Sequence, residues 1–140
     1  MWFLDTGYLI ALFSEKDTFH AQALAMQIRA QRERVRLVTT DAVVLEVGAA
    51  FSRVAMRGAG ASIMQALILD EGIEVVPVTE SLRSKALALF DQHQDKDWSL
   101  CDCMSFVLMR ERGLDSALTV DHHFVQAGFI ALLLQSNLTH

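Results

Sequence analysis

The sequence is poor in the residues that mark several classes of protein. It has one proline and two cysteines in 140 residues, with 52% hydrophobic and 21% charged residues. A disordered chain would have fewer apolar residues, and a disulfide-stapled one would have more cysteine pairs. The length and composition therefore predict a single globular domain over residues 1–140, large enough to bury a core.

Long apolar runs and a basic amino-terminal segment are also missing. The longest apolar runs, such as residues 129–134, are too short to span a bilayer. Asp5 interrupts the apolar run that begins at Trp2, so we expect no signal peptide, no membrane association and a cytoplasmic location. Cys101 and Cys103 match no zinc pattern, which favours a role as small apolar side chains.

A surplus of basic residues is absent as well. Lys plus Arg total 12 against 17 Asp plus Glu, for a net charge of −5, which argues against nucleic-acid binding by bulk charge. A bound metal would offset part of this acidity. The arginines also cluster, and we interpret the cluster as a solvated helix end, with a phosphate-contacting edge as the alternative. Its members are Arg29, Arg32, Arg34 and Arg36, with Arg53 and Arg57 on a second segment.

Four acidic residues stand far apart in the chain, each inside an apolar segment. They are Asp5, Glu46, Asp102 and Asp121. An ionised carboxylate is seldom buried unless it is paired or binds a metal, and no matching set of bases accompanies these four. The pattern predicts one shared cation. Structural roles remain open for each residue alone: Asp5 as a turn former, Glu46 paired with Arg53 or Arg57, and Asp121 as a helix cap.

Strand and helix patterns alternate along the chain, which predicts an α/β fold with a mainly parallel central sheet flanked by helices. We expect strands near residues 2–5, 35–38, 73–78, 117–120 and 129–134. Helices are expected near residues 8–13, 18–34, 42–57, 62–69, 81–92, 98–111 and 121–126. Gly58 and Gly60 are expected to end the helix that begins at Ala42.

This architecture gives the acids a place to meet, because ligands of open parallel sheets bind beyond the carboxyl ends of the strands. Asp5 and Asp121 directly follow predicted strands, and Glu46 and Asp102 lie about one turn into helices that begin at the same edge. Clustered carboxylates raise one another's pKa unless a cation is bound. Oxygen ligands suit Mg²⁺ or Mn²⁺ better than zinc, so we expect one of these ions.

Neighbouring polar residues have less certain assignments. Thr6 is expected to supply a hydroxyl that orients the nucleophile or a metal-bound water. His122 and His123 are adjacent and should point apart, which favours a surface or packing role. For Asp95 and Asp97, in the loop before the helix at 98–111, metal contact, phosphate-side contact and loop solvation all stay open.

These segments resemble the motifs of PIN-domain ribonucleases, most closely the VapC-like toxins of bacterial type II VapBC toxin–antitoxin pairs. The resemblance covers nearly the whole chain through residues 3–12 (FLDTGYLIAL), 39–47 (TTDAVVLEV), 97–106 (DWSLCDCMSF) and 117–124 (ALTVDHHF). It implies a PIN-like three-layer fold, a Mg²⁺- or Mn²⁺-dependent endoribonuclease with the four acids as its acidic quartet, a homodimer, and a cognate antitoxin whose tail covers the active site. Many relatives have a further acid where this chain has His122 and His123, so the number of metal ions stays open.

The leading hypothesis is hydrolysis of RNA by metal-activated water. In it Asp5, Asp102 and Asp121 hold the metal, and Glu46 orients water or a second ion. One alternative is a small Mg²⁺-dependent phosphohydrolase with Asp5 as the nucleophile, which is disfavoured because Gly7 stands where a second aspartate would be needed. Another is a non-catalytic PIN-like interaction module. The sequence leaves the RNA and its cleavage site open.

Overall fold

The computed structural model describes residues 1–135, and its strands form a five-stranded sheet in the order β3-β2-β1-β4-β5. Every neighbouring pair is parallel. The strands are β1 (Trp2–Leu4), β2 (Leu37–Thr40), β3 (Ile73–Val76), β4 (Ser116–Leu118) and β5 (Ile130–Ala131). The carboxyl ends of all strands therefore share one edge of the sheet, with β1 at its centre.

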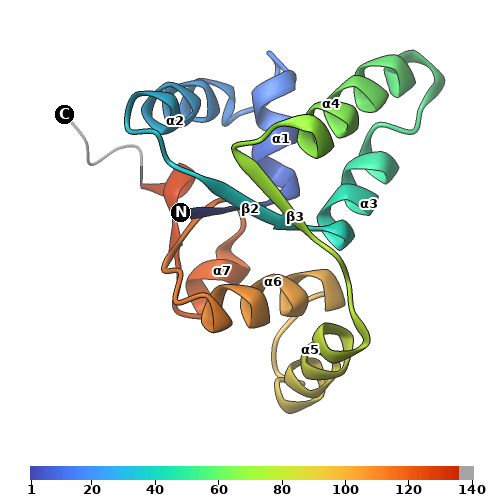
Figure 1. Ribbon diagram of the computed structural model, residues 1–140, viewed down its shortest axis with the longest axis vertical. Coiled ribbons are helices and arrows are strands. Elements are labelled where there is room, and N and C mark those ends of the chain that lie inside the picture. The colour runs from blue at the N-terminus through green and yellow to red at the C-terminus, as the bar shows by residue number, and fades with distance from the viewer. Residues whose placement is uncertain (136–140) are drawn as a thin grey trace.

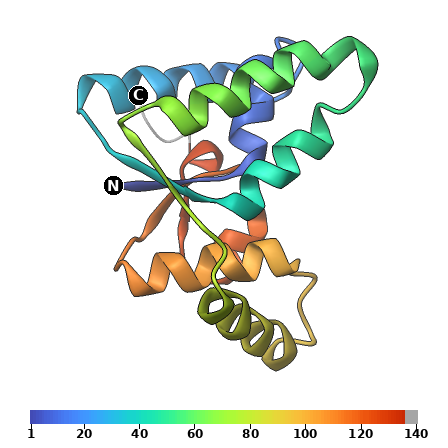
Figure 2. The ribbon, with the colours of Figure 1, turned by 45° about the vertical axis from the view of Figure 1, so that its right-hand side comes forward.

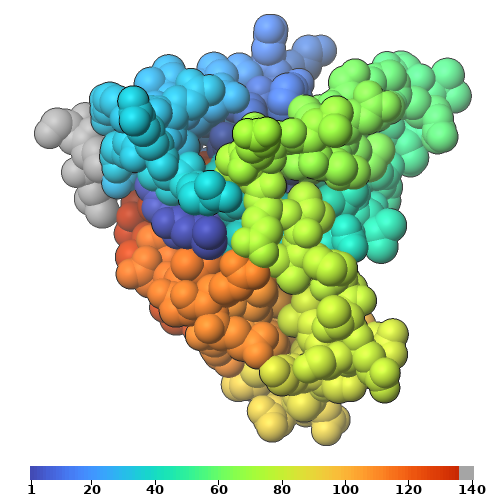
Figure 3. All heavy atoms as spheres, viewed as in Figure 1, coloured from blue at the N-terminus to red at the C-terminus, as the bar shows by residue number. Residues whose placement is uncertain are grey.

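Helices cover both faces of this sheet, which confirms the predicted three-layer α/β fold (Figures 1 and 2). On one face lie α1 (Thr6–Phe13), α2 (His20–Arg32), α3 (Asp41–Ala50) and α4 (Arg57–Leu69). On the other lie α6 (Leu100–Glu111) and α7 (His122–Gln126), and α5 (Glu80–Gln92) packs against α6 at the lower end of the molecule in Figure 3. Two 3₁₀ turns complete the described elements, at Val54–Met56 and Leu132–Leu134. Over the described range, no helix is both long and apolar enough to cross a membrane.

A cluster of aromatic rings joins the central strand to the helices on the α6 face. The ring of Phe106 in α6 lies 5.0 Å from Phe124 in α7, 5.1 Å from Trp98 and 5.7 Å from Phe129, measured between centroids. Phe124 in turn lies 6.1 Å from Phe3 in β1. Edge-to-face and tilted pairs of this kind each add about 0.5–1.5 kcal/mol beyond the burial of their area. The cluster therefore fixes β1, α6 and α7 relative to one another.

The helices that begin near the carboxyl edge are capped by side chains. The hydroxyl of Thr40 accepts from the third residue of α3, and that of Thr79 does the same for α5. Ser99 and the third residue of α6 form a reciprocal capping box, and Asp121 caps α7. Each such cap stabilises a helix by about 1 kcal/mol. The sequence offered Asp121 as a cap, and the structure confirms that it caps α7.

The predicted helix over residues 42–57 is wrong in its second half. Helix α3 ends at Ala50, and Phe51 closes it by donating its amide to Val47. Gly58 and Gly60 then lie in the first turn of α4 instead of ending the preceding helix. The reason is a close approach: a Cβ at Gly60 would lie 2.6 Å from Cβ of Phe51, so α4 crosses the end of α3 at a residue without a side chain.

Smaller differences at other element ends also have local causes. Helix α2 starts at His20, not near Thr18, because the Asp17 carboxylate accepts from the amide of Phe19 and holds a turn there. Strand β2 starts at Leu37, two residues later than expected, because Arg34 adopts a left-handed φ of 53°. The last strand is confined to residues 130–131, since the backbone turns into a 3₁₀ helix at Leu132.

The packing at Gly60 gives a stability prediction. Gly60→Ala should lower the free energy of unfolding by about 1–3 kcal/mol, because its Cβ would overpack against Phe51. Gly58→Ala is the matched control in the same helical turn: a Cβ there meets nothing within 4 Å, so stability should stay the same or rise by up to about 1 kcal/mol. Urea denaturation followed by circular dichroism measures both changes. Equal effects of the two substitutions would contradict the close approach.

Candidate active site

A cavity of about 870 Å³ opens at the carboxyl edge of the sheet. All five residues predicted for the site line it: Asp5, Thr6, Glu46, Asp102 and Asp121. They come from the end of β1, the start of α1, the middle of α3, the first turn of α6 and the turn after β4. The topology thus brings together residues that are up to 116 positions apart, from 5 to 121.

Asp5 is the most deeply placed of the acids, with 8% of its surface exposed. Its Oδ2 accepts a hydrogen bond of 2.8 Å from the hydroxyl of Thr119, which in turn accepts from the amide of Asp121 at 3.0 Å. Thr119 therefore connects two acids of the site. Sequence reasoning missed it, because it sits in an apolar strand segment where its hydroxyl gives no periodic signal.

Burial raises the pKa of Asp5 from 3.8 to about 7. Hydrogen bonds from Thr119 and from the amide of Thr6 lower the pKa, while the charges of Asp102 and Glu46 raise it further. The dominant cause is the loss of solvent around a carboxylate. Near neutral pH, Asp5 is thus a group that gains strongly from a nearby positive charge.

Thr6 and Glu46 form a second unit of the site. The Thr6 hydroxyl, in the first turn of α1, donates a 2.8 Å hydrogen bond to Oε1 of Glu46 on α3. No ion pair joins Glu46 to Arg53 or Arg57 within residues 1–135, and Arg57 donates instead to the carbonyl of Ser52. The alternative in which Glu46 serves as an arginine partner therefore has no support in the fold.

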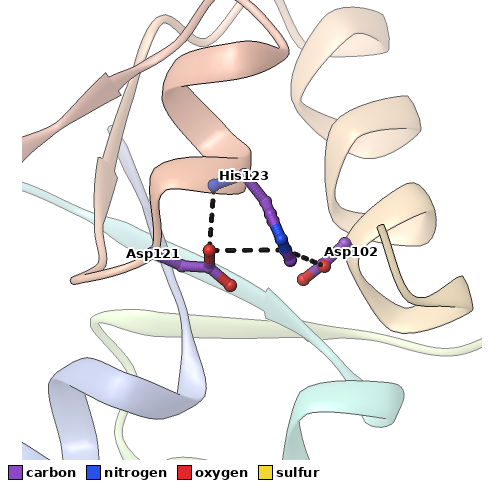
Figure 4. Close-up of side chains that lie close together, drawn as sticks. All are labelled: Asp102, Asp121 and His123. Carbon is purple, nitrogen blue, oxygen red and sulfur yellow. Dashed lines mark hydrogen bonds and ion pairs between the residues drawn. The ribbon is translucent and has the colours of Figure 1, made fainter. Parts of the chain in front are cut away.

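Asp102, Asp121 and His123 form the tightest cluster (Figure 4). Nδ1 of His123 lies 2.9 Å from Oδ2 of Asp102 and 3.4 Å from Oδ1 of Asp121. One ligand atom from each residue falls within 4.8 Å of the others, which makes this group a candidate metal site. The expected surface or packing role is wrong for His123, because the cap at Asp121 turns its ring into the cavity. Its neighbour His122 is exposed.

Burial raises the pKa of an acid in this cluster, as it does for Asp5. Burial raises the pKa of Asp102, whereas hydrogen bonds from the amide of Ser99 and from His123 lower it, and the charge of Asp121 raises it. The pKa of the Cys101 thiol is also raised, first by burial and then by Glu46, so this thiol stays neutral beside the acids. Asp5 after β1 and Asp102 in α6 are therefore both buried carboxylates that a bound cation would stabilise.

The loop before α6 contributes little to the cavity. Asp97 lies on its lining and is exposed at the rim. Asp95 does not line the cavity and forms an ion pair with Lys96 at 3.1 Å, which lowers the pKa of Asp95 through the hydrogen bond from that lysine. Of these two acids, only Asp97 is placed to meet a molecule that enters the site.

A second, more apolar cavity of about 470 Å³ lies between α1, α2 and α4. In the described part of the chain, Asp70 is the one acid on its lining, so the cavity has no cluster of carboxylates and we assign no chemistry to it. Arg34 and Arg36 lie at its border, just before β2, and Arg29 packs over the ring of Trp2. These arginines sit at the amino ends of the strands, opposite the acids, where they suit a solvated helix end and not a phosphate-contacting rim of the site.

The chain belongs to the PIN domain family, whose model matches residues 2–130. It is 30% identical over 131 residues to proteins named 23S rRNA-specific endonuclease VapC20 from Mycobacterium tuberculosis strains CDC 1551 / Oshkosh and ATCC 25618 / H37Rv, covering 93% of this chain and 96% of theirs. The similarity confirms the resemblance to VapC-like PIN domains that the sequence motifs indicated.

Solved structures agree with this family assignment. The crystal structure of Mycobacterium tuberculosis VapC20, described as a sarcin–ricin loop cleaving toxin, matches with a TM-score of 0.81 at 26% identity, over 93% of this chain and 97% of the other. FitAcB from Neisseria gonorrhoeae matches with a TM-score of 0.65 at 14% identity, over 94% and 95% of the two chains, which supports the fold alone.

The buried Asp5 predicts an unusual dependence of stability on pH. Because its pKa is about 7 in the folded state against 3.8 ordinarily, the folded protein holds this proton more tightly, and stability contributed by Asp5 falls as pH rises from about 4 to 7. Asp5→Asn keeps an oxygen that accepts from Thr119 and removes this loss. In metal-free buffer at pH 8 the variant should be more stable than the parent protein, by at most about 4 kcal/mol.

This advantage should shrink as the pH is lowered toward 4, and urea denaturation with a chelator present measures it. Asp91→Asn, at an exposed position on α5, is the control for the loss of one carboxylate from the protein. An Asp5→Asn protein that is less stable than the parent at pH 8 would show that Asp5 is not desolvated as described.

Proposed function

We propose that the chain is a Mg²⁺- or Mn²⁺-dependent endoribonuclease and the toxin of a toxin–antitoxin pair. The observation that carries this proposal is the meeting of four separate acids and Thr6 in one cavity, in a PIN-domain chain 30% identical to an rRNA-specific endonuclease over 93% of its length. Within residues 1–135, no Lys or Arg forms an ion pair with these four acids, and a site with this donor set suits metal-assisted hydrolysis of a phosphodiester.

The donor atoms fit a divalent ion. Each acid uses one carboxylate oxygen in a local hydrogen bond: Asp5 with Thr119, Glu46 with Thr6, Asp102 with Ser99, and Asp121 with the amide of His123. These bonds fix the orientation of each carboxylate at the cavity. Asp5, Asp102 and Asp121 would hold the ion, with Glu46 near them.

A bound Mg²⁺ or Mn²⁺ would lower the pKa of a water molecule and offset charge on the phosphate. The protein's own groups orient that water. Because the Thr6 hydroxyl donates a hydrogen bond to Glu46, its lone pairs are free to accept a hydrogen bond from water, and the second oxygen of Glu46 can accept another. Water positioned in this way attacks phosphorus as the bond to the leaving oxygen breaks, and the products are two shorter RNA strands.

We propose ribosomal RNA as the first substrate to test, on the basis of the similarity to VapC20. A cytoplasmic location follows from that substrate. We also propose a homodimer and a cognate antitoxin whose tail covers the acidic cavity. Large apolar side chains remain exposed, including Ile28 at 60%, Val54 at 91% and Leu69 at 78%, and surface of this kind often marks protein contacts.

Substitution of a proposed metal-holding residue tests the activity. Asp102→Asn keeps an oxygen that can accept from Ser99, so α6 should fold normally, but cleavage should fall by at least about 100-fold because a ligand has been weakened. The assay incubates purified protein with ribosomal RNA in Mg²⁺ or Mn²⁺, and a chelator should stop cleavage by the parent protein.

Asp41→Asn is the matched control, because Asp41 is exposed on α3 and outside the cavity lining. It should cleave like the parent. Cleavage that persists in Asp102→Asn, or in the presence of the chelator, would refute the metal-dependent mechanism. Metal binding without any cleavage of RNA would instead favour the interaction module.

The homodimer and the antitoxin complex can be tested separately from the nuclease activity. Light scattering on the purified chain should give about twice the monomer mass of 15.6 kDa, and co-expression with the adjacent small reading frame should recover a complex that no longer cleaves RNA. A monomer at all concentrations would exclude the homodimer. A complex that retains full activity would exclude a tail that covers the cavity.

A further inference from the structure

We propose that His123 is a direct nitrogen ligand of the ion at this site and that it shifts the preference of the site from Mg²⁺ toward Mn²⁺. The inference rests on the proposed function, since it concerns the same ion. It goes further by adding one imidazole nitrogen, beside Asp102 and Asp121, to the carboxylate oxygens that would hold the ion.

The backbone around Asp121 aims the histidine at the acids. Oδ1 of Asp121 accepts from the amide of His123 at 2.8 Å, which fixes the first turn of α7. The ring then projects between the carboxylates of Asp102 and Asp121, as Figure 4 shows. The side chains of these three residues keep 29% (His123), 13% (Asp102) and 36% (Asp121) of their surface exposed, so an ion can reach them from the cavity.

The distances suit ligation. Two neighbouring ligands on a six-coordinate ion with bonds of about 2.1 Å are about 3 Å apart. Nδ1 of His123 lies 2.9 Å from the Asp102 oxygen and 3.4 Å from the Asp121 oxygen. Nδ1 is thus about as far from each carboxylate oxygen as two neighbouring ligands of one ion are from each other. Small rotations of the side chains would place an ion among the three atoms.

The chemistry of imidazole predicts the change in selectivity. Carboxylate and water oxygens suit Mg²⁺, whereas imidazole nitrogen suits transition metals. A site with a neutral imidazole ligand has one negative charge fewer than a site with a carboxylate at the same position. The lower charge weakens the electrostatic binding on which Mg²⁺ depends. Mn²⁺ accepts both types of donor and so loses less from the exchange.

A different role for His123 makes a different prediction. If the ring only orients Asp102 through the 2.9 Å contact, its loss should weaken the binding of Mg²⁺ and Mn²⁺ in parallel, by about 10–100-fold, and no nitrogen should be bound to the ion. If the ring is a ligand, the ratio of the two affinities should change and nitrogen should be detected directly. The two roles are therefore separable without measuring cleavage.

The experiment adds Mn²⁺ to the metal-free full-length protein and records electron spin echo modulation, which detects nitrogen bound to Mn²⁺, together with calorimetric affinities for both ions. The parent protein should show the nitrogen signal. His123→Gln should lose it and should lower the ratio of Mn²⁺ to Mg²⁺ affinity by about tenfold or more. His123→Asp supplies an oxygen donor and should also lose the signal, while binding Mg²⁺ more tightly than the parent does.

His122→Gln is the matched control, because this exposed histidine lines the same cavity but lies outside the cluster of Asp102, Asp121 and His123, and the variant should keep both the signal and the affinity ratio. A parent protein that binds Mn²⁺ without a nitrogen signal, or a His123→Gln protein that keeps the signal, overturns this inference and leaves the nuclease proposal intact. Failure of the parent protein to bind either ion overturns both. Circular dichroism of each variant establishes that it is folded.

Discussion

The removal of carboxylates from water at one edge of the sheet is the constraint on which this structure depends. Asp5 and Asp102 have raised pKa values because burial removes the water that would otherwise stabilise their charge. The fold holds them there by hydrogen bonds to every acid of the site and by the aromatic cluster beneath, in which Phe3, Phe106 and Phe124 each lie close in sequence to a site residue. Packing thus holds these carboxylates in a place where a bound cation or a proton stabilises them.

Much of this arrangement could be predicted from the sequence, because it depends on features that are local. The alternation of strands and helices sets the parallel sheet, and a residue that follows a strand in such a sheet has to lie at its carboxyl edge. The positions of Asp5 and Asp121 follow from that rule alone. Glu46 and Asp102 follow from their positions about one turn into helices that begin at the same edge.

What could not be predicted depends on contacts between distant segments or on the direction of a single side chain. The glycines near residue 60 resemble a helix end, and only their contact with Phe51 explains why they begin a helix instead. Thr119 looks like part of an apolar strand until the carboxylate of Asp5 is placed beside it. The ring of His123 turns inward because of one cap, a detail that residue spacing does not encode.

The bond between Thr119 and Asp5 spans 114 residues and links the two ends of the described chain. Synthesis on the ribosome proceeds from the amino terminus, so a growing chain carries Asp5 and Glu46 long before Asp121 has been added. The strand that completes the centre of the sheet, β4, also arrives late. A chain that ends before β4 therefore lacks Asp121, Thr119 and the strand that pairs with β1 on that side. The site is completed only after residues 116–121 have been synthesised.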